Sequence, residues 1–455
     1  MPDSTIAIVG GGASGALLAA ALLERSRSAK VIVFEPRAQL GTGVAYSTDC
    51  PLHLLNVPAG KMSAFAGDPG HFIRWLDDRY PATYGAHSFV PRQIYGEYLQ
   101  SIVSRTARDA GDRFTHVRDS VVDVVVEGED AIVCSSGGAA VRADAVVIAC
   151  GNAAPAPVRG FALEGRSPRY FASAWDKDAL VPENEDDTVL LIGTGLTSVD
   201  AVLGLRHNGH RGTIYMVSRR GLLPHEHRLF DAPPDAFSEL ENANDLLGAA
   251  RLLTRGAKNR AENWRVSMER VRPATNALWQ TSTLSDQRRF LRHVLPYWNI
   301  HRHRMAPEVV RLLADLTASN TLHMLAGRTG DAISSDDHIV IPVKLRGKEE
   351  TLRIRAQRVI NCSGPMHDFR RLENPLVQNL LERGLMAPYP LNIGVQVAGD
   401  GALIDARGNV SQRVFSIGPV RFGALIETTA IPEIRAQAAA LAHVLAGRDR
   451  SATTA

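Results

Sequence analysis

The sequence feature that most limits the possible folds is a strand, a glycine-rich turn and a helix in direct succession, and it occurs twice. The first copy has an apolar run at residues 5–9, the turn Gly10-Gly11-Gly12-Ala13-Ser14-Gly15, and then an Ala- and Leu-rich stretch. The second copy starts at residues 188–192 and continues through Gly193-Thr194-Gly195-Leu196-Thr197-Ser198. Short apolar strands that alternate with helices predict parallel sheets. We therefore expect an α/β fold with two Rossmann-like domains.

The residues of the first turn suit the binding of a dinucleotide. Gly10 permits a tight turn, Gly12 lets backbone N–H groups approach a pyrophosphate, and Gly15 lets the helix pack close to the strand. A second apolar strand at residues 31–34 is followed by Glu35, where a carboxylate can accept a hydrogen bond from an unphosphorylated ribose. A first site for FAD or NAD is therefore predicted, formed by Gly10, Gly12, Ala13, Ser14, Gly15 and Glu35. The alternative, an accidental glycine-rich turn, is the weaker interpretation in this context.

The second turn keeps two glycines and has Ser198, another small residue, at the third position. Its second strand ends in Ser218-Arg219-Arg220-Gly221 rather than in an acid. Guanidinium groups bind a 2′-phosphate well, whereas a carboxylate would repel it. We therefore predict that Arg219, Arg220 and the turn from Gly193 to Ser198 bind NADPH. The alternative is that one or both arginines are solvated surface charges.

Composition excludes several other classes of protein. The 455 residues are enough for two or three domains, and 51 basic residues nearly balance 48 acidic ones, so no extended surface for nucleic acid is expected. The cysteines Cys50, Cys134, Cys150 and Cys362 are far apart, which argues against a disulfide framework, a zinc ribbon and a dithiol centre. The apolar stretch after the first turn is too short to span a bilayer. We expect a soluble, cytoplasmic protein with no membrane partner.

The rest of the chain falls into three patterns. Residues 117–134 alternate with a period of two and predict antiparallel hairpins, and residues 143–149 form a buried strand closed by Gly151. Residues 152–157 contain two prolines and are typical of a linker. At residues 225–306 the apolar residues have helical spacing, which predicts a helical excursion.

Further strings along nearly the whole chain resemble an FAD/NAD(P)-binding family of two-dinucleotide-binding-domain flavoproteins, which is similar to N-hydroxylating and flavin-containing monooxygenases. The resemblance is carried by GTGVAY at 41–46, LLNVP at 54–58, VPR at 90–92, YGEYL at 95–99, the second turn at 193–200, SRRG at 218–221, RHR at 302–304, IGP at 417–419 and ETTA at 427–430. It implies FAD in the first site and NADPH in the second. Because residues 360–364 and 417–418 resemble strand ends that return to a first sheet, it also implies a discontinuous FAD domain at 1–165 and 345–455, and an NADPH domain at 166–344.

The resemblance also implies which residues lie near the flavin. In flavin-containing monooxygenases an Asn-x-Pro-Lys segment lies beside the isoalloxazine, and Asn56-Val57-Pro58 followed by Lys61 is similar. Asn56 and Lys61 are therefore implied as catalytic residues, although a loop asparagine can instead cap its own backbone. Gly151, Gly418 and Thr428 are implied as cofactor contacts, with backbone N–H groups near Gly418 stabilising negative charge on the reduced ring.

The activity implied by the resemblance is that of an NADPH-dependent, N-hydroxylase-like flavoprotein monooxygenase. Such an enzyme would use molecular oxygen, through a flavin C4a-hydroperoxide, on a small polar substrate that can carry a carboxylate. Residues 170–175 read YFASAW where flavin monooxygenases have an F-x-G-x-x-x-H string, which argues against Baeyer–Villiger chemistry. The alternatives are an NADPH:acceptor reductase or dehydrogenase without oxygen insertion, and a flavin-bound sensor or interaction protein.

The most basic stretch of the chain lies in the helical excursion, at residues 288–304. Trp298, Arg302 and His303 from this stretch are candidates for contact with the substrate, because guanidinium groups bind carboxylates. The alternative is a solvated helix face with a buried tryptophan. Two His-x-His pairs in the excursion have no cysteine or carboxylate ligands nearby in the sequence, so no metal site is expected.

Overall fold

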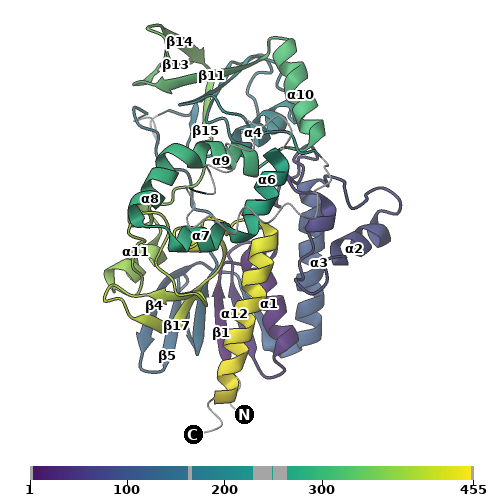
Figure 1. The fold of residues 1–455 in the computed structure, drawn as a ribbon, viewed down its shortest axis with the longest axis vertical. Helices are drawn as coiled ribbons and strands as arrows, with labels where there is room; N and C mark the ends of the chain where they lie inside the picture. The colour runs from purple at the N-terminus through teal and green to yellow at the C-terminus, as the bar shows by residue number, and fades with distance from the viewer. Residues whose placement is uncertain (1–3, 162–166, 229–247, 249–263, 452–455) are drawn as a thin grey trace.

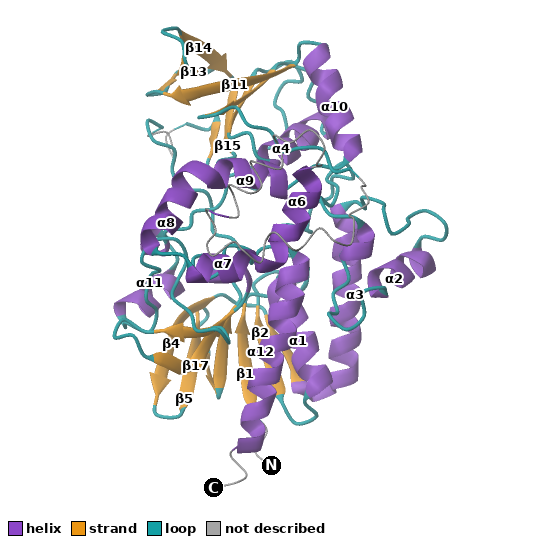
Figure 2. Cartoon of the chain, in the orientation of Figure 1, coloured by secondary structure: helices purple, strands orange, loops and turns teal. Residues whose placement is uncertain are grey.

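The molecule has two α/β halves arranged end to end, with a group of short helices between them (Figure 1). The computed structural model describes residues 4–161, 167–228, 248 and 264–451. Each half contains its own mostly parallel sheet (Figure 2). The expected fold class, α/β with two Rossmann-like domains, is confirmed.

The first sheet has six strands in the order β16-β17-β7-β1-β2-β3. Neighbours from β17 to β3 run parallel, and β16 pairs antiparallel with β17. The central strands are apolar and almost fully buried, as strands with both faces covered must be. The strands are β1 (Thr5–Val9), β2 (Lys30–Phe34), β3 (Phe114–Val117), β7 (Ala145–Ile148), β16 (Ala402–Ile404) and β17 (Val410–Ser416).

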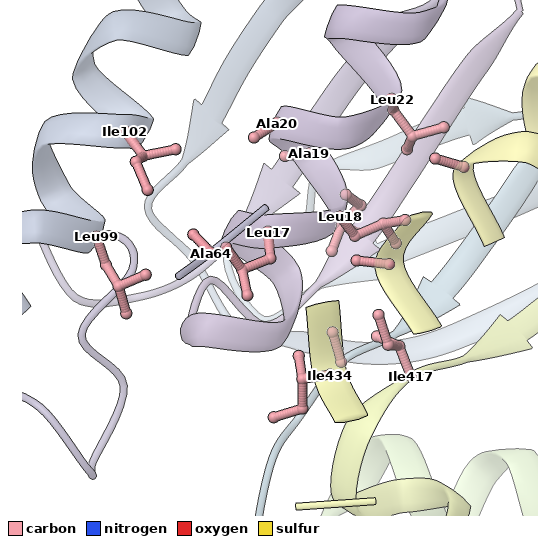
Figure 3. Packing of buried hydrophobic residues seen from close by; sticks show 14 of the residues in the cluster. Leu17, Leu18, Ala19, Ala20, Leu22, Ala64, Leu99, Ile102, Ile417 and Ile434 are labelled. Atoms are coloured by element: carbon pink, nitrogen blue, oxygen red, sulfur yellow. The ribbon is translucent and has the colours of Figure 1, made fainter. Parts of the chain in front are cut away.

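Helices cover one face of this sheet and a small antiparallel sheet covers the other. On the first face, α1 (Ala13–Arg25) and α12 (Ile431–Ser451) lie side by side, next to α3 (Arg92–Ala110) (Figure 1). Leu18 of α1 and Ile434 of α12 belong to one buried cluster (Figure 3). The other face carries β4 (Val121–Glu127), β5 (Asp130–Ser135), β6 (Ala140–Ala143) and α11 (Pro375–Glu382).

The second sheet has the strand order β12-β13-β11-β10-β9-β15-β8, and β14 pairs with β13. Strands β11, β10, β9, β15 and β8 run parallel, whereas β12, β13 and β14 form an antiparallel extension. Helices α4 (Leu196–His207) and α10 (Pro307–Ala318) contribute to the core on one face. The strands are β8 (Tyr170–Phe171), β9 (Val189–Ile192), β10 (Ile214–Ser218), β11 (Leu322–Thr329), β12 (Ile333–Ser334), β13 (Ile339–Leu345), β14 (Thr351–Ala356) and β15 (Arg358–Asn361).

Strand β15 lies in a different place from the one expected. The sequence predicts that the first domain resumes at residue 345, but β15 pairs parallel with both β9 and β8 of the second sheet. A short buried apolar strand fits the middle of either parallel sheet, so its pattern does not say which sheet it joins. We therefore propose a boundary after Asn361. The division into an FAD domain and an NADPH domain stays a prediction.

The described part of the expected helical excursion consists of short helices that lie between the two sheets (Figure 1). Its residues 229–247 and 249–263 lie outside the described residues. Trp279, Phe290 and Trp298 form a buried cluster with Phe422 and Ile426, so these helices pack on the segment before α12. The elements are α6 (Trp264–Val271), α7 (Thr275–Thr281), α8 (Leu284–Arg289), the π-helical turn η5 (Phe290–Val294) and α9 (Leu295–Arg302).

The remaining elements are α2 and several 3₁₀ turns at loop ends. They are α2 (His71–Arg79), η1 (Ala59–Lys61), η2 (Gly111–Arg113), η4 (Arg272–Ala274), η6 (Phe369–Arg371) and η7 (Gly418–Arg421).

None of the helices in the described ranges is long and apolar enough to cross a bilayer.

Candidate functional site

The first glycine turn follows β1 at the carboxyl end of the first sheet, where ligands of α/β proteins bind. A Cβ on Gly10 would lie 2.5 Å from the Ala149 carbonyl oxygen. A Cβ on Gly15 would overlap the Gly10 carbonyl oxygen and lie 3.1 Å from its carbon. The fold itself therefore requires glycine at both positions, because Gly10 lies against the backbone that follows β7, and Gly15 of α1 lies against the backbone of Gly10.

Gly12 differs from its neighbours because the fold does not require a glycine there. Its φ is −68°, and the nearest atom to an added Cβ would be the Gly43 Cα at 3.4 Å. Gly12 is also the N-cap of α1 and supplies no side-chain hydrogen bond to the first turn of the helix. Backbone N–H groups at an uncapped helix start suit an anion. This open strip of backbone fits the pyrophosphate of a dinucleotide.

Glu35 lies at the end of β2 and is already hydrogen-bonded within the protein. Its carboxylate accepts from the Gly11 N–H at 3.0 Å and from the Arg37 Nε at 2.8 Å. Burial alone would raise the Glu35 pKa, but the hydrogen bonds from Arg37 and Gly11 outweigh it and lower the pKa. The ionised carboxylate keeps the capacity to accept from a ribose hydroxyl. Arg37, which follows Glu35 by two residues, was not among the site residues predicted from the sequence.

A cavity of about 530 Å³ adjoins the carboxyl end of β7. The residues that line it include Cys150, Gly151, Met366 and Val420. Gly151 has a φ of +72°, and no protein atom lies within 4 Å of where its Cβ would be. The structure therefore places Gly151 at an open site beside the first sheet.

Gly418 and Thr428 come together with the first turn of α1. A Cβ on Gly418 would lie 2.5 Å from the Ser14 Oγ, so the Ser14 side chain packs directly against the Gly418 backbone. The Thr428 hydroxyl donates to the Gly418 carbonyl at 2.8 Å, and the Gly418 N–H donates to Gln437 Oε1 at 2.9 Å. Gln437, on α12, also donates to the Thr428 hydroxyl at 2.9 Å. Gln437 was missed in the sequence because it lies inside a helix pattern.

Asn56 and Lys61 lie on the loop before and within η1. Asn56 is half-buried, and its carboxamide has no hydrogen-bond partner among the described residues, so no self-capping is seen. The Lys61 Nζ lies 3.6 Å from Glu269 Oε2 of α6, and its side chain is 54% exposed. Both side chains therefore keep polar atoms that a ligand could use.

Glu269 is the centre of a group of cationic side chains. It accepts from Arg304, and the Arg272 guanidinium lies 3.9 Å away. Burial raises the Glu269 pKa, but Lys61, Arg304 and Arg272 outweigh it and lower the pKa. Burial and the charges of Arg304 and Lys61 lower the pKa of His227 to about 4. At neutral pH this group is therefore a carboxylate and a neutral imidazole among positive charges.

Arg304 has unmet hydrogen-bonding capacity. Its side chain is 4% exposed, yet its Nε and Nη1 find no acceptor in the described part of the chain. A buried guanidinium with unpaired N–H groups is costly unless an anion joins it. In the sequence, Arg304 is one of several basic residues in the stretch 288–304. Nothing in that stretch distinguishes Arg304 from the neighbouring arginines as a ligand-binding residue.

The second glycine turn repeats the geometry of the first. A Cβ on Gly193 would overlap the Cys362 carbonyl oxygen and lie 2.9 Å from its carbon, so the fold requires this glycine. Gly195 is the N-cap of α4, makes no side-chain cap, and has no protein atom within 4 Å of where its Cβ would be. Ser198 is fully buried in the first turn of α4. Gly195, like Gly12, leaves an open approach to a helix start that begins with Leu196 and Thr197.

Arg219 and Arg220 follow β10, but their surroundings differ. Arg219 is exposed and has no ion-pair or hydrogen-bond partner among the residues that the structure describes. The Arg220 guanidinium lies 5.8 Å from the ring centre of Tyr297 on α9 and donates to the Arg292 carbonyl at 3.3 Å. Arg219 is therefore the better placed of the two to meet a phosphate.

Trp298 and Arg302 do not have the arrangement expected of a substrate clamp. Arg302 is 5% exposed in its side chain, and its guanidinium pairs with Glu427 at 2.9 Å and with Glu433 at 3.2 Å. The Trp298 indole N–H donates to Glu427 at 3.3 Å. These groups link α9 to Glu427 before α12 and to Glu433 in its first turn, so we propose that Trp298 and Arg302 have a structural role. His303 is partly exposed, and burial together with the Arg302 charge lowers its pKa to about 3.

The side chains that commonly bind metals are scattered rather than clustered. No set of three or more His, Cys, Asp or Glu side chains in the described ranges is placed to hold a metal ion. Cys50, Cys134, Cys150 and Cys362 are all free.

Comparison with known proteins supports this geometry. Residues 7–153 match a family described as FAD-NAD(P)-binding. No curated protein matches the sequence. The family match confirms the recognition of an FAD/NAD(P)-binding segment, and the structural matches that follow confirm the fold.

The fold is similar to those of N-hydroxylating enzymes and reductases. An ornithine N-hydroxylase from Kutzneria sp. 744, solved with reduced FAD, NADP⁺ and L-ornithine, is 14% identical with a TM-score of 0.64, over 99% of this chain and 100% of that chain. L-lysine 6-monooxygenase from Pseudomonas syringae is 13% identical with a TM-score of 0.67, over 98% and 99%. Bacillithiol disulfide reductase from Bacillus cereus is 15% identical with a TM-score of 0.55, also over 98% and 99%. At these identities the similarity establishes the fold.

Proposed function

We propose that this protein is an FAD-dependent, NADPH-using monooxygenase that hydroxylates a small polar substrate bearing a carboxylate. The observation that carries the proposal is the pair of uncapped helix starts, at Gly12 and Gly195, each at the carboxyl end of a parallel strand. The fold does not need glycine at either position, so an approaching ligand explains both. The first of them lies in the part of the chain that matches the FAD-NAD(P)-binding family.

The two sites differ in the charge that faces the ribose. Glu35 would accept from the free hydroxyls of an FAD ribose, and its lowered pKa keeps it ionised for that purpose. At the second site, the exposed Arg219 would pair with the 2′-phosphate of NADPH. When bound, NADPH would supply a hydride and the reduced flavin would activate molecular oxygen, while the protein would supply binding, orientation and exclusion of water.

Residues around Asn56 and Gly418 would orient the flavin. The unpaired Asn56 carboxamide can both donate and accept a hydrogen bond at a ring edge. Gln437 and Thr428 hold the Gly418 backbone in place through three hydrogen bonds. The helices from α6 to α9 pack on residues near Phe422 and would shield this region from water.

The buried charges between α6, α9 and η1 support a substrate with a carboxylate. Three buried arginines face three carboxylates in this network, and the half-exposed Lys61 adds a further positive charge at its edge: Arg272, Arg302 and Arg304 against Glu269, Glu427 and Glu433. Arg304 holds the unmet N–H groups, so it is the residue that we expect to bind the carboxylate. The similarity in fold to an ornithine N-hydroxylase and a lysine monooxygenase is consistent with an amino acid substrate.

Rapid mixing of reduced protein with oxygen tests this proposal. FAD-loaded protein is reduced anaerobically with NADPH and then mixed with oxygen, with and without a panel of diamino acids and simple amines. A monooxygenase consumes oxygen before the oxidised flavin spectrum returns, and a true substrate yields product labelled from ¹⁸O₂. Immediate recovery of the oxidised spectrum with release of hydrogen peroxide, for every compound tested, would refute oxygen insertion.

The same experiment separates the two alternatives. An NADPH:acceptor reductase would be reduced rapidly and would then pass electrons to a quinone or disulfide with no ¹⁸O in any product. A flavin-bound sensor would be reduced by NADPH far more slowly than flavoenzymes turn over. Either result would replace the monooxygenase proposal.

A further inference from the structure

Arg92 connects the two halves of the molecule. Its guanidinium pairs with the Asp200 carboxylate through Nη1 at 2.9 Å and Nη2 at 3.2 Å, and the side chains are 14% and 8% exposed. The Arg92 Nε also donates to the Leu54 carbonyl at 3.1 Å, and its backbone N–H donates to the His53 carbonyl at 2.8 Å. One side chain therefore binds both a loop of the first half and α4 of the second.

His53 makes a second polar contact with the same turn of α4. It is 2% exposed, its Nε2 lies 2.8 Å from the Asp200 carbonyl oxygen, and its Nδ1 lies 2.7 Å from the Thr48 hydroxyl. A carbonyl can only accept, so Nε2 carries the proton and Nδ1 accepts from Thr48. The imidazole is thereby held in one tautomer against the α4 backbone.

A glycine on α4 lies beside this contact, where the helix packs on Leu180 of its own half and next to His53 of the first half. Gly204 lies one turn after Asp200, and a Cβ on it would lie 2.7 Å from Leu180 Cδ1 and 3.5 Å from His53 Nε2. Glycine inside a helix is unfavourable unless close packing requires it. Apolar residues of the first half also join this contact, because Leu54 and Phe89 pack against the core of the second half.

The contact lies between the two proposed sites. Asp200 is in the second turn of α4, whose first residue, Leu196, follows the glycine turn at Gly195. Leu54, which Arg92 binds, precedes Asn56 by two residues. The polar contacts between the proposed NADPH helix and the loop before Asn56 therefore comprise the Arg92–Asp200 ion pair and three hydrogen bonds, from Arg92 to Leu54, from Arg92 to His53 and from His53 to Asp200.

We propose that Arg92, Asp200 and His53 are positioning residues that hold the start of α4 at a fixed place relative to the Asn56 loop. The contact would set the approach of the nicotinamide to the flavin without touching either cofactor. Its catalytic meaning rests on the proposed function, because it concerns hydride transfer from NADPH to FAD. The contact itself belongs to the protein and can be measured without cofactors.

Asp200→Asn is the main test, because it keeps the size of the side chain and removes its charge. Reduction of bound FAD is followed by anaerobic rapid mixing over a range of NADPH concentrations. We expect the limiting reduction rate to fall at least about tenfold, since small misplacement of reacting groups is costly. The NADP⁺ dissociation constant should change by less than about threefold, because the groups that touch the nucleotide are intact. Arg92→Lys keeps the positive charge but loses the two parallel N–H donors of the guanidinium. The limiting reduction rate of this variant should therefore lie between those of the wild-type protein and Asp200→Asn.

Asp123→Asn is a matched control. Asp123 pairs with Arg383 at 2.6 Å, which is the same type of ion pair, but both residues belong to the first half. This variant should be reduced at the wild-type rate. A wild-type rate in Asp200→Asn, or an equal loss in Asp123→Asn, would overturn the proposal.

Hydrogen exchange of the cofactor-free protein makes the result independent of the proposed function. Asp200→Asn should speed amide exchange in both residues 48–56 and the first turns of α4, and Asp123→Asn should not. If the wild-type protein is not reduced by NADPH, the proposed function fails, and exchange alone then decides on the contact. Unchanged exchange at both segments would overturn the positioning role. If Asp200→Asn does not fold, Arg92→Lys provides both measurements.

Discussion

Replacing Gly12 or Gly15 with alanine should separate cofactor binding from stability. The two glycines belong to one turn, but they differ in what an added methyl group would meet. At Gly12 the nearest atom is 3.4 Å away, whereas at Gly15 the methyl would overlap the Gly10 carbonyl oxygen. The structure therefore predicts opposite behaviour from two identical substitutions three residues apart.

The expected change in unfolding free energy follows from these contacts. Gly12→Ala restricts the conformations of the unfolded chain, which raises the free energy of unfolding by about 0.4–1 kcal/mol. Alanine is also a poorer N-cap than glycine, which lowers the free energy of unfolding by about the same amount. The cofactor-free variant should therefore unfold within about 1 kcal/mol of wild type. Gly15→Ala forces the backbone of α1 away from β1, and overpacking of this kind costs about 1–3 kcal/mol or more.

Urea unfolding with and without FAD measures both effects. FAD at a hundred times its dissociation constant should stabilise the wild-type protein by about 2.7 kcal/mol. Gly12→Ala should lose most of this gain, because its methyl group occupies the strip of backbone where the pyrophosphate would lie. If cofactor-free Gly12→Ala loses as much stability as Gly15→Ala, the reasoning from the fold is wrong. If Gly12→Ala binds FAD as tightly as the wild-type protein does, the proposed FAD site is wrong.

Three further predictions concern the charged residues. Wild-type protein should prefer NADPH over NADH by about ten- to a hundredfold in kcat/KM. Arg219→Ala should remove more of this preference than Arg220→Ala, because the Arg220 guanidinium already contacts Tyr297. Equal use of both nucleotides by the wild-type protein would contradict this prediction. Folded His227 has a pKa of about 4, below the ordinary 6.5, so it binds its proton more weakly than the unfolded chain does, and stability should fall as the pH drops from about 6.5 to about 4. The loss is at most about 3 kcal/mol before solvent screening, and denaturation across this range should show a shallower slope in His227→Gln. Arg304→Met should raise the KM for an amino acid substrate at least about tenfold and leave that for an amine without a carboxylate unchanged, because the unmet N–H groups of Arg304 are lost. It should also lower the free energy of unfolding, because Glu269 loses its ion pair with Arg304. An equal effect on the KM of both substrates would exclude Arg304 as the carboxylate-binding residue.

Local patterns in the sequence were sufficient to predict the two glycine turns and the elements around them. The strand at residues 5–9, the turn from Gly10 and the helix that follows are present as β1 and α1, and the second copy is present as β9 and α4. Each pattern spans fewer than thirty residues and is set by turn geometry and by close packing of helix on strand. The same reasoning found the place of Glu35 at the end of β2, although it did not find the hydrogen bonds from Arg37.

Long-range contacts decided the rest. Arg302 and Arg304 are two residues apart and chemically identical, yet Arg302 is paired with Glu427, 125 residues away, and Arg304 keeps unmet N–H groups. Arg92 meets Asp200 at a separation of 108 residues. The pattern of β15 likewise fits either sheet, and only the tertiary structure shows that it pairs with β9. The sequence alone determined which backbone turns could receive a nucleotide, because those depend on neighbouring residues. The tertiary structure decided which charges are free to bind a ligand, because a charge is free or paired according to residues that are distant in the chain.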